Sequence, residues 1–504
     1  MRGKRVLSGL RNEKGSLLLV TYFVVAILLG IGAAFLMLVS SESRIAERQR
    51  LTTIAFHIAE AGVEKGLYEL KQDFINASGM PSWSDGDING YSIGPDTADF
   101  YTIPYSSTSL NDGTYLVELK NVAGSSDDIW IRSTGTISGV SHTISIYTKM
   151  VSLSSWEYAI FAGSGATGTM INGVVDIRGS VIVLGDGLAD GDYAMDLGGT
   201  AEIVGNNYNT LDAGLLAKVP PLPTTTFNGE VVETLNAELR VKKGLVGLSG
   251  ASSVGEIDVS GNSVKETVDA VYVTDGWGGN QGANQVFSDN GSAQAYDLED
   301  AMAFPSLSDP YPGYADYQDY LKNTGYVLTA AEAATLANLN PNTPAFAYGD
   351  ANGSISMDGA GNLAIDGIVY LDNDADLVLN KDGTAKTVTY TGSGSILVTG
   401  NVHIDASLVT AGNNSFPTNI MGIMTPKNIS FTDSDLDVMG LFYAENSVIA
   451  QKQTDIVGTI VSNYFDMGTN VPAIYQVPEV ANNLPPGLIG ADARWYMVVA
   501  WLKS

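Results

Sequence analysis

The sequence contains no cysteine, only three histidines and few cations, and each shortage excludes a class of function. The 504 residues carry 26 Lys and Arg against 55 Asp and Glu, a formal net charge of −29. Without cysteine there can be no disulfide, thiolate nucleophile, Cys-ligated zinc or iron–sulfur cluster. His57, His142 and His403 are widely separated, which argues against a multi-histidine metal site. Nucleic-acid binding requires a basic surface, so we expect no nucleic-acid partner.

Charged residues are also scarce, whereas apolar residues and glycine are abundant. Charged residues make up 16% of the chain and apolar residues 45%, which excludes a disordered chain. Glycine, with 56 residues, lies above the usual share and predicts many turns between short strands.

The N-terminus predicts a membrane anchor. Residues 1–15 form a basic leader, and residues 17–39 then run for 23 residues without a charge, long enough to cross a bilayer. A cleaved signal peptide has a shorter apolar region, so we expect a single-pass anchor in the inner or cytoplasmic membrane, in contact with its lipid. The flanking cations predict a cytoplasmic N-terminus and an exported remainder.

The helix is expected to continue past the membrane to about residue 75. No proline interrupts residues 41–75, and one apolar stripe follows helical spacing. Such a stripe must be covered by a neighbouring helix or by the protein's own globular domain. The predicted packing residues are Leu51, Ile54, Ala55, Ile58, Ala61 and Gly62.

These features resemble a type IV prepilin. A basic leader ends in Lys14-Gly15, a long apolar helix follows at once, and residues 55–62 read AFHIAEAG. That segment is similar to the A-F-x-x-A-E-A-G segment of PilX-type minor pilins of type 4 fimbrial biogenesis. The resemblance implies that a prepilin peptidase cuts between Gly15 and Ser16. It also implies that the helix packs with other pilins and pilus assembly proteins.

Two positions depart from major pilins. Those proteins begin with an aromatic residue and carry a Glu at mature position five, where this chain has Ser16 and Val20. In major pilins that carboxylate is thought to meet the N-terminal amine of a neighbour, since a charge inside lipid needs a partner. The resemblance therefore implies a minor, tip or initiating subunit.

Beyond residue 76 the pattern becomes β. Residues 76–150 alternate in strand fashion, which predicts a small pilin-like antiparallel sheet packed on the helix. Residues 151–504 contain short apolar runs punctuated by Gly, Asn and Asp. Gly422, Gly440 and Gly458 lie 18 residues apart, which favours a right-handed parallel β-helix-like domain over an antiparallel sandwich.

A loop insertion is predicted at about 270–350, and it holds the candidate ligand-binding residues. They are Trp277, Tyr311, Tyr314 and Tyr317, aromatic side chains suited to a surface glycan or a protein. The same aromatics could equally pack against the β domain. Thr329-x-x-Glu332 forms a capping box that predicts a short helix to about Leu339.

We expect no cofactor, with Ca²⁺ as the one alternative. Asp186, Asp190 and Asp192 lie in a stretch similar to repeat-type calcium loops. From residue 151 onward the only arginines are Arg178, Arg240 and Arg494, too few for the carboxylate and cation constellation of a polysaccharide-cleaving enzyme.

The sequence thus favours a non-enzymatic minor pilin of a type IV pilus or pseudopilus, with the β domain displayed at the pilus or cell surface as a cap or adhesive head. The alternative is a single-pass surface protein whose β-helix binds or cleaves glycan and has no connection with pili.

Overall fold

The structure is a computed structural model. It describes residues 13–76, 87–88, 91–92, 100–102, 108–110, 112–122, 128–165, 174–227, 229–257, 270–280, 285–288, 295–296, 298, 302–467, 472–490 and 494–503. The chain forms two compact units, and each is described by itself. The first comprises residues 1–151 and 495–504, and the second comprises residues 152–494.

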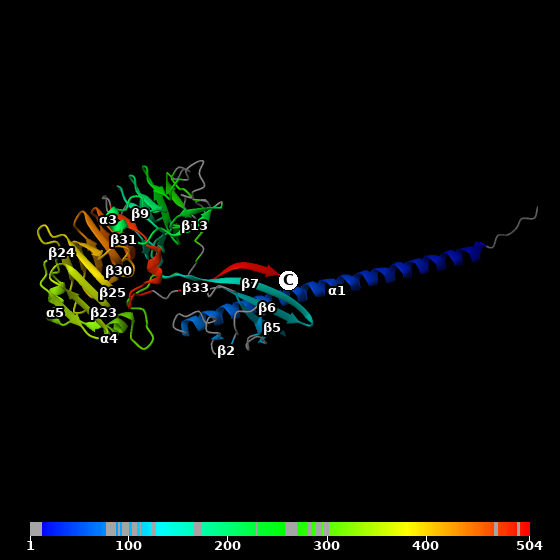
Figure 1. The fold of residues 1–504 in the computed structure, drawn as a ribbon. Coiled ribbons are helices and arrows are strands. Elements are labelled where there is room, and N and C mark those ends of the chain that lie inside the picture. Colours follow the sequence, from blue (N-terminus) through cyan, green and yellow to red (C-terminus); the bar gives the residue numbers. More distant parts are fainter. Residues whose placement is uncertain are drawn as a thin grey trace, which may run out of the picture. The chain divides into compact units, whose positions relative to one another are not determined.

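The first unit is built on one long helix. Helix α1 runs without interruption over Glu13–Asn76, and Figure 1 shows it extending far beyond the sheet on which it lies. The absence of proline and the dense Leu, Ala and Glu content favour this continuity. The leader, residues 1–12 of which lie outside the described residues, thus ends within the first turn of α1.

An antiparallel sheet covers one face of the outer part of α1. The strand order is β3-β5-β6-β7-β33, and β4 also pairs with β5. The long strands alternate buried and half-buried residues, as a sheet with one covered face requires. The strands of this unit are β1 (Asp87–Ile88), β2 (Tyr91–Ser92), β3 (Tyr101–Thr102), β4 (Thr108–Leu110), β5 (Gly113–Asn121), β6 (Asp128–Ile137), β7 (Val140–Ser152) and β33 (Arg494–Lys503).

The last strand corrects the predicted domain boundary. The sequence pattern predicts one β-helix-like domain over 151–504, but β33 joins the first unit as the neighbour of β7. The second unit is therefore an insertion between two strands that are adjacent in the sheet. Sequence could not reveal this, because a ten-residue apolar strand carries no signal of which sheet it will join.

The second unit is mainly β. Its first half contains η2 (Ser155–Glu157), β8 (Ile160–Ala162), β9 (Asp176–Arg178), β10 (Val181–Val183), β11 (Tyr193–Leu197), β12 (Glu202–Gly205), α3 (Ala213–Leu216), β13 (Thr224–Phe227), β14 (Glu230–Glu233), β15 (Glu238–Val241), β16 (Leu245–Leu248), β17 (Ser253–Val254), β18 (Ala270–Val273) and β19 (Trp277–Gly279).

Its second half contains α4 (Tyr317–Thr324), β20 (Tyr326–Val327), α5 (Ala330–Leu336), β21 (Phe346–Gly349), β22 (Gly353–Met357), β23 (Asn362–Leu371), β24 (Leu377–Asn380), β25 (Thr387–Val398), β26 (Val402–Asp405), β27 (Ser407–Thr410), β28 (Ile420–Thr425), β29 (Asn428–Phe431), β30 (Leu436–Ala450), β31 (Thr454–Asp466), β32 (Ala473–Tyr475) and η3 (Pro478–Asn482).

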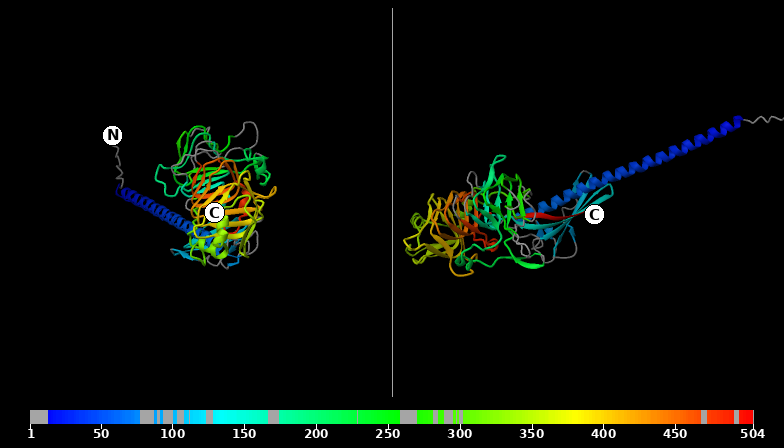
Figure 2. Two further views of the ribbon diagram at one scale, coloured as in Figure 1. Left: turned by 90° about the vertical axis from the view of Figure 1, so that its left-hand side faces the viewer. Right: turned by 90° about the horizontal axis from the view of Figure 1, so that it is seen from above.

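Most of these strands pair in parallel, and we call this array the parallel stack. Gly440 pairs with Gly458, as the 18-residue spacing predicts, whereas Gly422 pairs with Leu441 and lies one position out of that register. Parallel pairing of successive strands is what stacked coils require and an antiparallel sandwich does not provide. Figure 2 shows β23–β31 running side by side.

The chain enters the parallel stack at its middle. Strand β8 lies between β10 and β31, the latter some 300 residues later in sequence. From β8 the stack grows through β10 and β15 to β18, and in the other direction through β31, β30, β28 and β25 to β23. The antiparallel hairpin of β21 and β22 and the short strand β20 pair with β23 at that end.

A continuous apolar column fills the interior of the stack. One residue from each of these strands contributes, every pair is in register, and each side chain is almost completely buried. Burial of such a side chain stabilises the fold by about 1.5–3 kcal/mol, so the column is a large part of the core. The column is Val369, Ile396, Ile423, Phe442, Ile460, Ile160, Val181, Leu239 and Val271.

The segment predicted as a loop insertion connects the two ends of the stack. Strand β19 follows β18 at one end, and β20 pairs with β23 at the other. On the way Phe304 stacks between Phe161 and Tyr443, and the Tyr443 hydroxyl donates a hydrogen bond to the Pro305 carbonyl. Helix α5 begins with the predicted Thr329–Glu332 capping box.

A glycine substitution at a corner of the stack should be strongly destabilising. Strand β30 passes from pairing with β27 to pairing with β28 around Gly440, on which Gly458 stacks. Gly458 has φ +136°, and a methyl group there would overlap the Gly440 carbonyl oxygen. We expect Gly458→Ala to cost roughly 3 kcal/mol, measured by urea unfolding. Gly412→Ala is the control, since its φ is +84° but the space is open; equal losses in both variants would contradict the role of this overlap.

Candidate functional site

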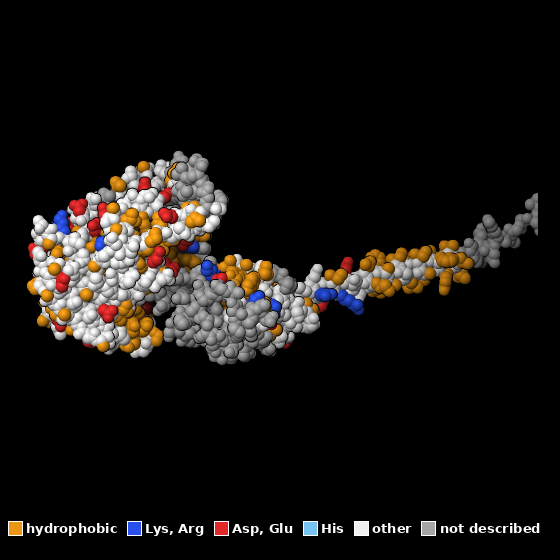
Figure 3. Space-filling view, viewed as in Figure 1, with side chains coloured by type: hydrophobic (Ala, Val, Ile, Leu, Met, Phe, Trp, Pro, Cys, Tyr) orange, Lys and Arg blue, Asp and Glu red, His pale blue; other side chains and the backbone are white. Residues whose placement is uncertain are grey.

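The first half of α1 is fully exposed, and it is apolar over residues 17–39. Residues 17–50 are all exposed in this chain, including large side chains such as Phe35 at 63% and Leu36 at 72%. Figure 3 shows hydrophobic side chains along the visible face of this part of the helix, followed by charged ones. Within the described residues, α1 is the one helix long and apolar enough to cross a membrane.

The second half of α1 is docked on the sheet of its own unit. Ala55, Ile58 and Gly62 from the predicted stripe are buried against β5 and β6, Leu51 and Ile54 are half-buried, and Ala61 lies at the edge. Ala59, Val63, Gly66 and Leu70 complete the buried face and were missed. Of the two covers considered, a neighbouring helix and the protein's own domain, the structure supplies the second for residues 51–70.

Small residues let the helix approach the sheet to backbone contact. A methyl group on Gly135 of β6 would overlap the Ala55 carbonyl oxygen and lie 2.5 Å from the Ala59 nitrogen. Ala55 and Ala59 of the AFHIAEAG segment therefore serve this contact, and Glu60 accepts a hydrogen bond from His57 at 2.8 Å on the outer side.

The predicted processing residues lie at the start of α1. Lys14, Gly15 and Ser16 belong to its first turn. Continuous helix on both sides of the Gly15–Ser16 bond means that a peptidase cutting there would have to unwind the first turn.

The four predicted ligand-binding aromatics do not form one site. Trp277 lies on β19, which pairs with β16 and follows β18 at one end of the stack. Tyr311, Tyr314 and Tyr317 lie near α4, which packs on β23 at the opposite end of the stack. The three tyrosines and Tyr320 contact one another with ring centroids 4.4–6.3 Å apart.

Nor does the structure gather the predicted calcium ligands. Asp186, Asp190 and Asp192 are exposed, and the Asp192 carboxylate accepts a hydrogen bond from the Ala189 nitrogen at 2.9 Å within a turn. In the described part of the chain, no group of three or more His, Asp or Glu side chains is placed to hold a metal ion.

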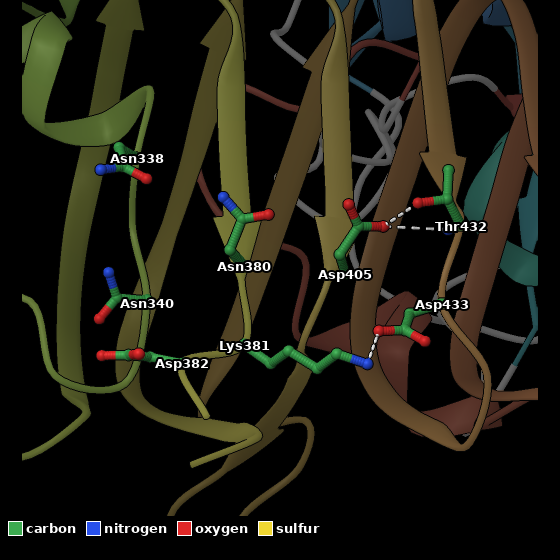
Figure 4. Close-up of a pocket in the computed structure, with 8 residues that line it drawn as sticks. All are labelled: Asn338, Asn340, Asn380, Lys381, Asp382, Asp405, Thr432 and Asp433. Atoms are coloured by element: carbon green, nitrogen blue, oxygen red, sulfur yellow. Dashed lines mark hydrogen bonds and ion pairs between the residues drawn. The ribbon is translucent and has the colours of Figure 1, made fainter. Parts of the chain in front are cut away.

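A polar depression that sequence analysis missed lies across the strands of the second half of the stack. It measures about 650 Å³ and is lined by Asn338, Asn340, Asn380, Lys381, Asp382, Asp405, Thr432 and Asp433 (Figure 4). Asn380 and Asp405 are in register on β24 and β26, and both Thr432 donors bond to the Asp405 carboxylate. In the sequence, each of these strands ends with an apolar residue followed by a polar one. This pattern could indicate a site only if the register that places the polar residues side by side were known.

Two half-buried carboxylates lie side by side elsewhere in the stack, and their ionisation destabilises the fold. Asp437 and Asp455 are in register on β30 and β31. Burial raises the pKa of Asp455 to about 6, and the carboxylates of Asp437, Asp212 and Asp176 act in the same direction. Burial likewise raises the pKa of Asp437.

Replacing Asp455 should therefore stabilise the protein at neutral pH. The folded-state pKa exceeds the ordinary value, so ionisation opposes folding as pH rises from about 4 through 6. We expect Asp455→Asn to gain about 1–2 kcal/mol at pH 8, after allowance for solvent screening, and nothing at pH 4. Urea unfolding at both values tests this against Asp366→Asn on an exposed position of β23; a gain that is independent of pH would contradict it.

Comparison with solved structures identifies the architecture. The crystal structure of the competence-associated pilin ComZ from Thermus thermophilus matches with a TM-score of 0.51 at 20% sequence identity, over 90% of this chain and 97% of that one. The fold is pilin-like. A long N-terminal helix is followed by mostly β structure, as the sequence resemblance implied. No family model and no curated protein matches the chain.

Proposed function

We propose that the protein is a non-enzymatic minor subunit of a type IV pilus or pseudopilus. The observation that carries the proposal is the division of α1 into a bare apolar half and a docked half within one unbroken helix. The docked half has its apolar face covered by its own sheet, whereas residues 17–50 are exposed on every side and contain the apolar run 17–39 that can meet lipid or other subunits. The pilin-like fold supports the same reading.

The finer parts of the proposal follow from the resemblance. The protein is of the PilX type, its leader is removed after Gly15 by a prepilin peptidase, and its N-terminus faces the cytoplasm. Ser16 and Val20 stand where major pilins, which repeat along the shaft, carry an aromatic residue and a Glu. This difference favours a tip or initiating position. The second unit is a right-handed parallel β-helix displayed outward, on the pilus or the cell surface.

Processing can be tested directly. Protein isolated from cells is expected to begin at Ser16, and Gly15→Val is expected to retain the leader, with Gly3→Val as the control that does not. Mass spectrometry of the mature N-terminus distinguishes these outcomes. An intact leader in the unmodified protein would instead support the plain membrane anchor.

Association through the helix can be tested because the chain has no cysteine of its own. A cysteine introduced by Leu36→Cys on the bare half is expected to cross-link to other pilins in the membrane, whereas Ile257→Cys, on an exposed position of the second unit, is not. Deletion of the gene should reduce the number of surface filaments. Filaments in normal number, together with no cross-linked product, would overturn the proposal.

A further inference from the structure

The polar depression presents one column of side chains at the ends of three strands, β24, β26 and β29, and beside the isolated bridge at Leu339. Leu339 forms a parallel bridge with Leu379, which places the next residues, Asn340 and Asn380, side by side. Asn380 pairs with Asp405, and Asp405 accepts a hydrogen bond from Thr432. The column in register is therefore Asn340, Asn380, Asp405 and Thr432. Their apolar neighbours Leu379, Ile404 and Phe431 are buried, which directs the polar residues outward. At about 4.8 Å between strands, the column is on the order of 15 Å long.

The charged groups in the depression are largely satisfied internally. Lys381 reaches across to Asp433, and this ion pair holds the pKa of Asp433 below its ordinary value (Figure 4). Asp382 accepts a hydrogen bond from the Asn342 amide at 3.1 Å, and Asp405 accepts both Thr432 donors. A cationic ligand would have to compete with these partners.

The carboxamides are the groups that remain available. Among the described residues, nothing forms a hydrogen bond with the side chain of Asn338 or Asn380. Each carboxamide offers a donor and an acceptor side by side, which matches a hydroxyl group in both of its roles. Asn340 retains its NH₂ donor while its oxygen accepts from the Asn342 nitrogen at 2.9 Å.

We propose that this depression binds a neutral, hydroxyl-rich glycan chain lying along the column. The ligand is elongated because the polar groups repeat from strand to strand, and it is uncharged because the free groups are amides. A polyanion would be repelled by a chain of net charge −29. An apolar ligand would leave the polar lining without partners, and the described side chains provide no metal site here.

The site is distinct from the predicted aromatic residues. Neither Trp277 nor the tyrosines near α4 line it. Recognition therefore depends on hydrogen bonds from amides fixed on rigid strands, and no ring stacks on the sugar. The inference does not depend on the pilus proposal, since a glycan site on the second unit would serve a pilin and a plain surface protein alike.

The test uses the full chain in a detergent without a sugar head group, such as an amine oxide. An array of neutral glycans identifies a binder, and isothermal titration calorimetry with neutral hexasaccharides (maltohexaose, cellohexaose and chitohexaose) measures the dissociation constant. We expect saturable binding that Asn338→Ala and Asn380→Ala each weaken about tenfold, equivalent to about 1.4 kcal/mol. Asn380→Asp, which replaces the NH₂ donor by an acceptor oxygen and adds a negative charge, should also weaken it.

Asn209→Ala is the matched control, an exposed asparagine in the other half of the stack, and it should leave binding unchanged. The proposal is overturned if no neutral glycan binds, or if binding is the same in the double variant Asn338→Ala and Asn380→Ala. It is also overturned if spermine binds there and Asp382→Asn abolishes that binding, because the site would then be cationic in preference. Filament counts are independent of these measurements, so failure here leaves the proposed function standing.

Discussion

Gly135→Ala is expected to undock the outer half of α1 from its sheet. The added methyl group would overlap the backbone of α1 at Ala55 and Ala59, and backbone cannot move aside as a side chain can. We expect a loss of roughly 3 kcal/mol, at the upper end of overpacking effects. Hydrogen exchange of residues 51–70 and of β6 measures it as a loss of amide protection.

Gly66→Ala provides the matched contrast on the helix side of the same contact. There the added methyl group meets only side-chain methyl groups, Ile131 Cγ2 at 3.1 Å and Val117 Cγ1 at 3.3 Å. Alanine also favours helix by about 1 kcal/mol over glycine, so the net change should be small. Equal protection in Gly135→Ala and the unmodified protein would show that the helix does not rest on this backbone contact.

Arg178→Met should destabilise the second unit by about 3 kcal/mol. The Arg178 side chain is only 8% exposed, and its guanidinium bonds to Asp176 at 2.7 Å, to Glu256 and to Asn207, with Glu202 at 3.6 Å. Methionine keeps much of the volume but leaves the carboxylates without their cation, which is the costly way to break a buried pair. Urea unfolding followed by tryptophan fluorescence measures the change.

The pH dependence of this variant identifies its cause. Burial raises the pKa of Glu256 although Arg178 opposes the shift, so removing Arg178 should raise it further. The loss should then shrink as pH falls and Glu256 takes up a proton, and adding Glu256→Gln should recover part of it at neutral pH. Lys322→Met is the control, since the Lys322 side chain is 46% exposed and, among the described residues, forms an ion pair with one carboxylate, that of Asp372. A loss of the same size there would contradict the network argument.

The helix and the parallel pairing could be predicted because their signals are local. Residues 17–39 are uncharged and predominantly apolar throughout, and the stripe over 51–62 keeps the helical period. The 18-residue spacing of Gly440 and Gly458 corresponds to one layer of the stack. Hydrophobic period and glycine spacing can both be read along the chain, so they can be recognised without knowing which segment packs against it.

What could not be predicted depends on contacts between distant segments. The pairing of β8 with β31 and the place of β33 beside β7 join residues hundreds of positions apart. The polar depression likewise exists only because Asn380, Asp405 and Thr432 share a register set by layers of unequal length. Aromatic clustering drew attention to Tyr311 and its neighbours instead, and those rings pack on one another.

Strands β8 and β31 pair at the middle of the stack, so the chain enters the second unit away from the β18 end, where a further layer could be added. Layers can be gained or lost beyond β18 without altering where the chain comes in from β7, whereas the segment that leads back to β33 rests on α4 and β23 through Leu488 and Gly487. Such an arrangement allows relatives of this protein to vary the number of layers in the second unit while the first unit stays constant. Length variation among homologues should accordingly concentrate at the β18 end of the stack.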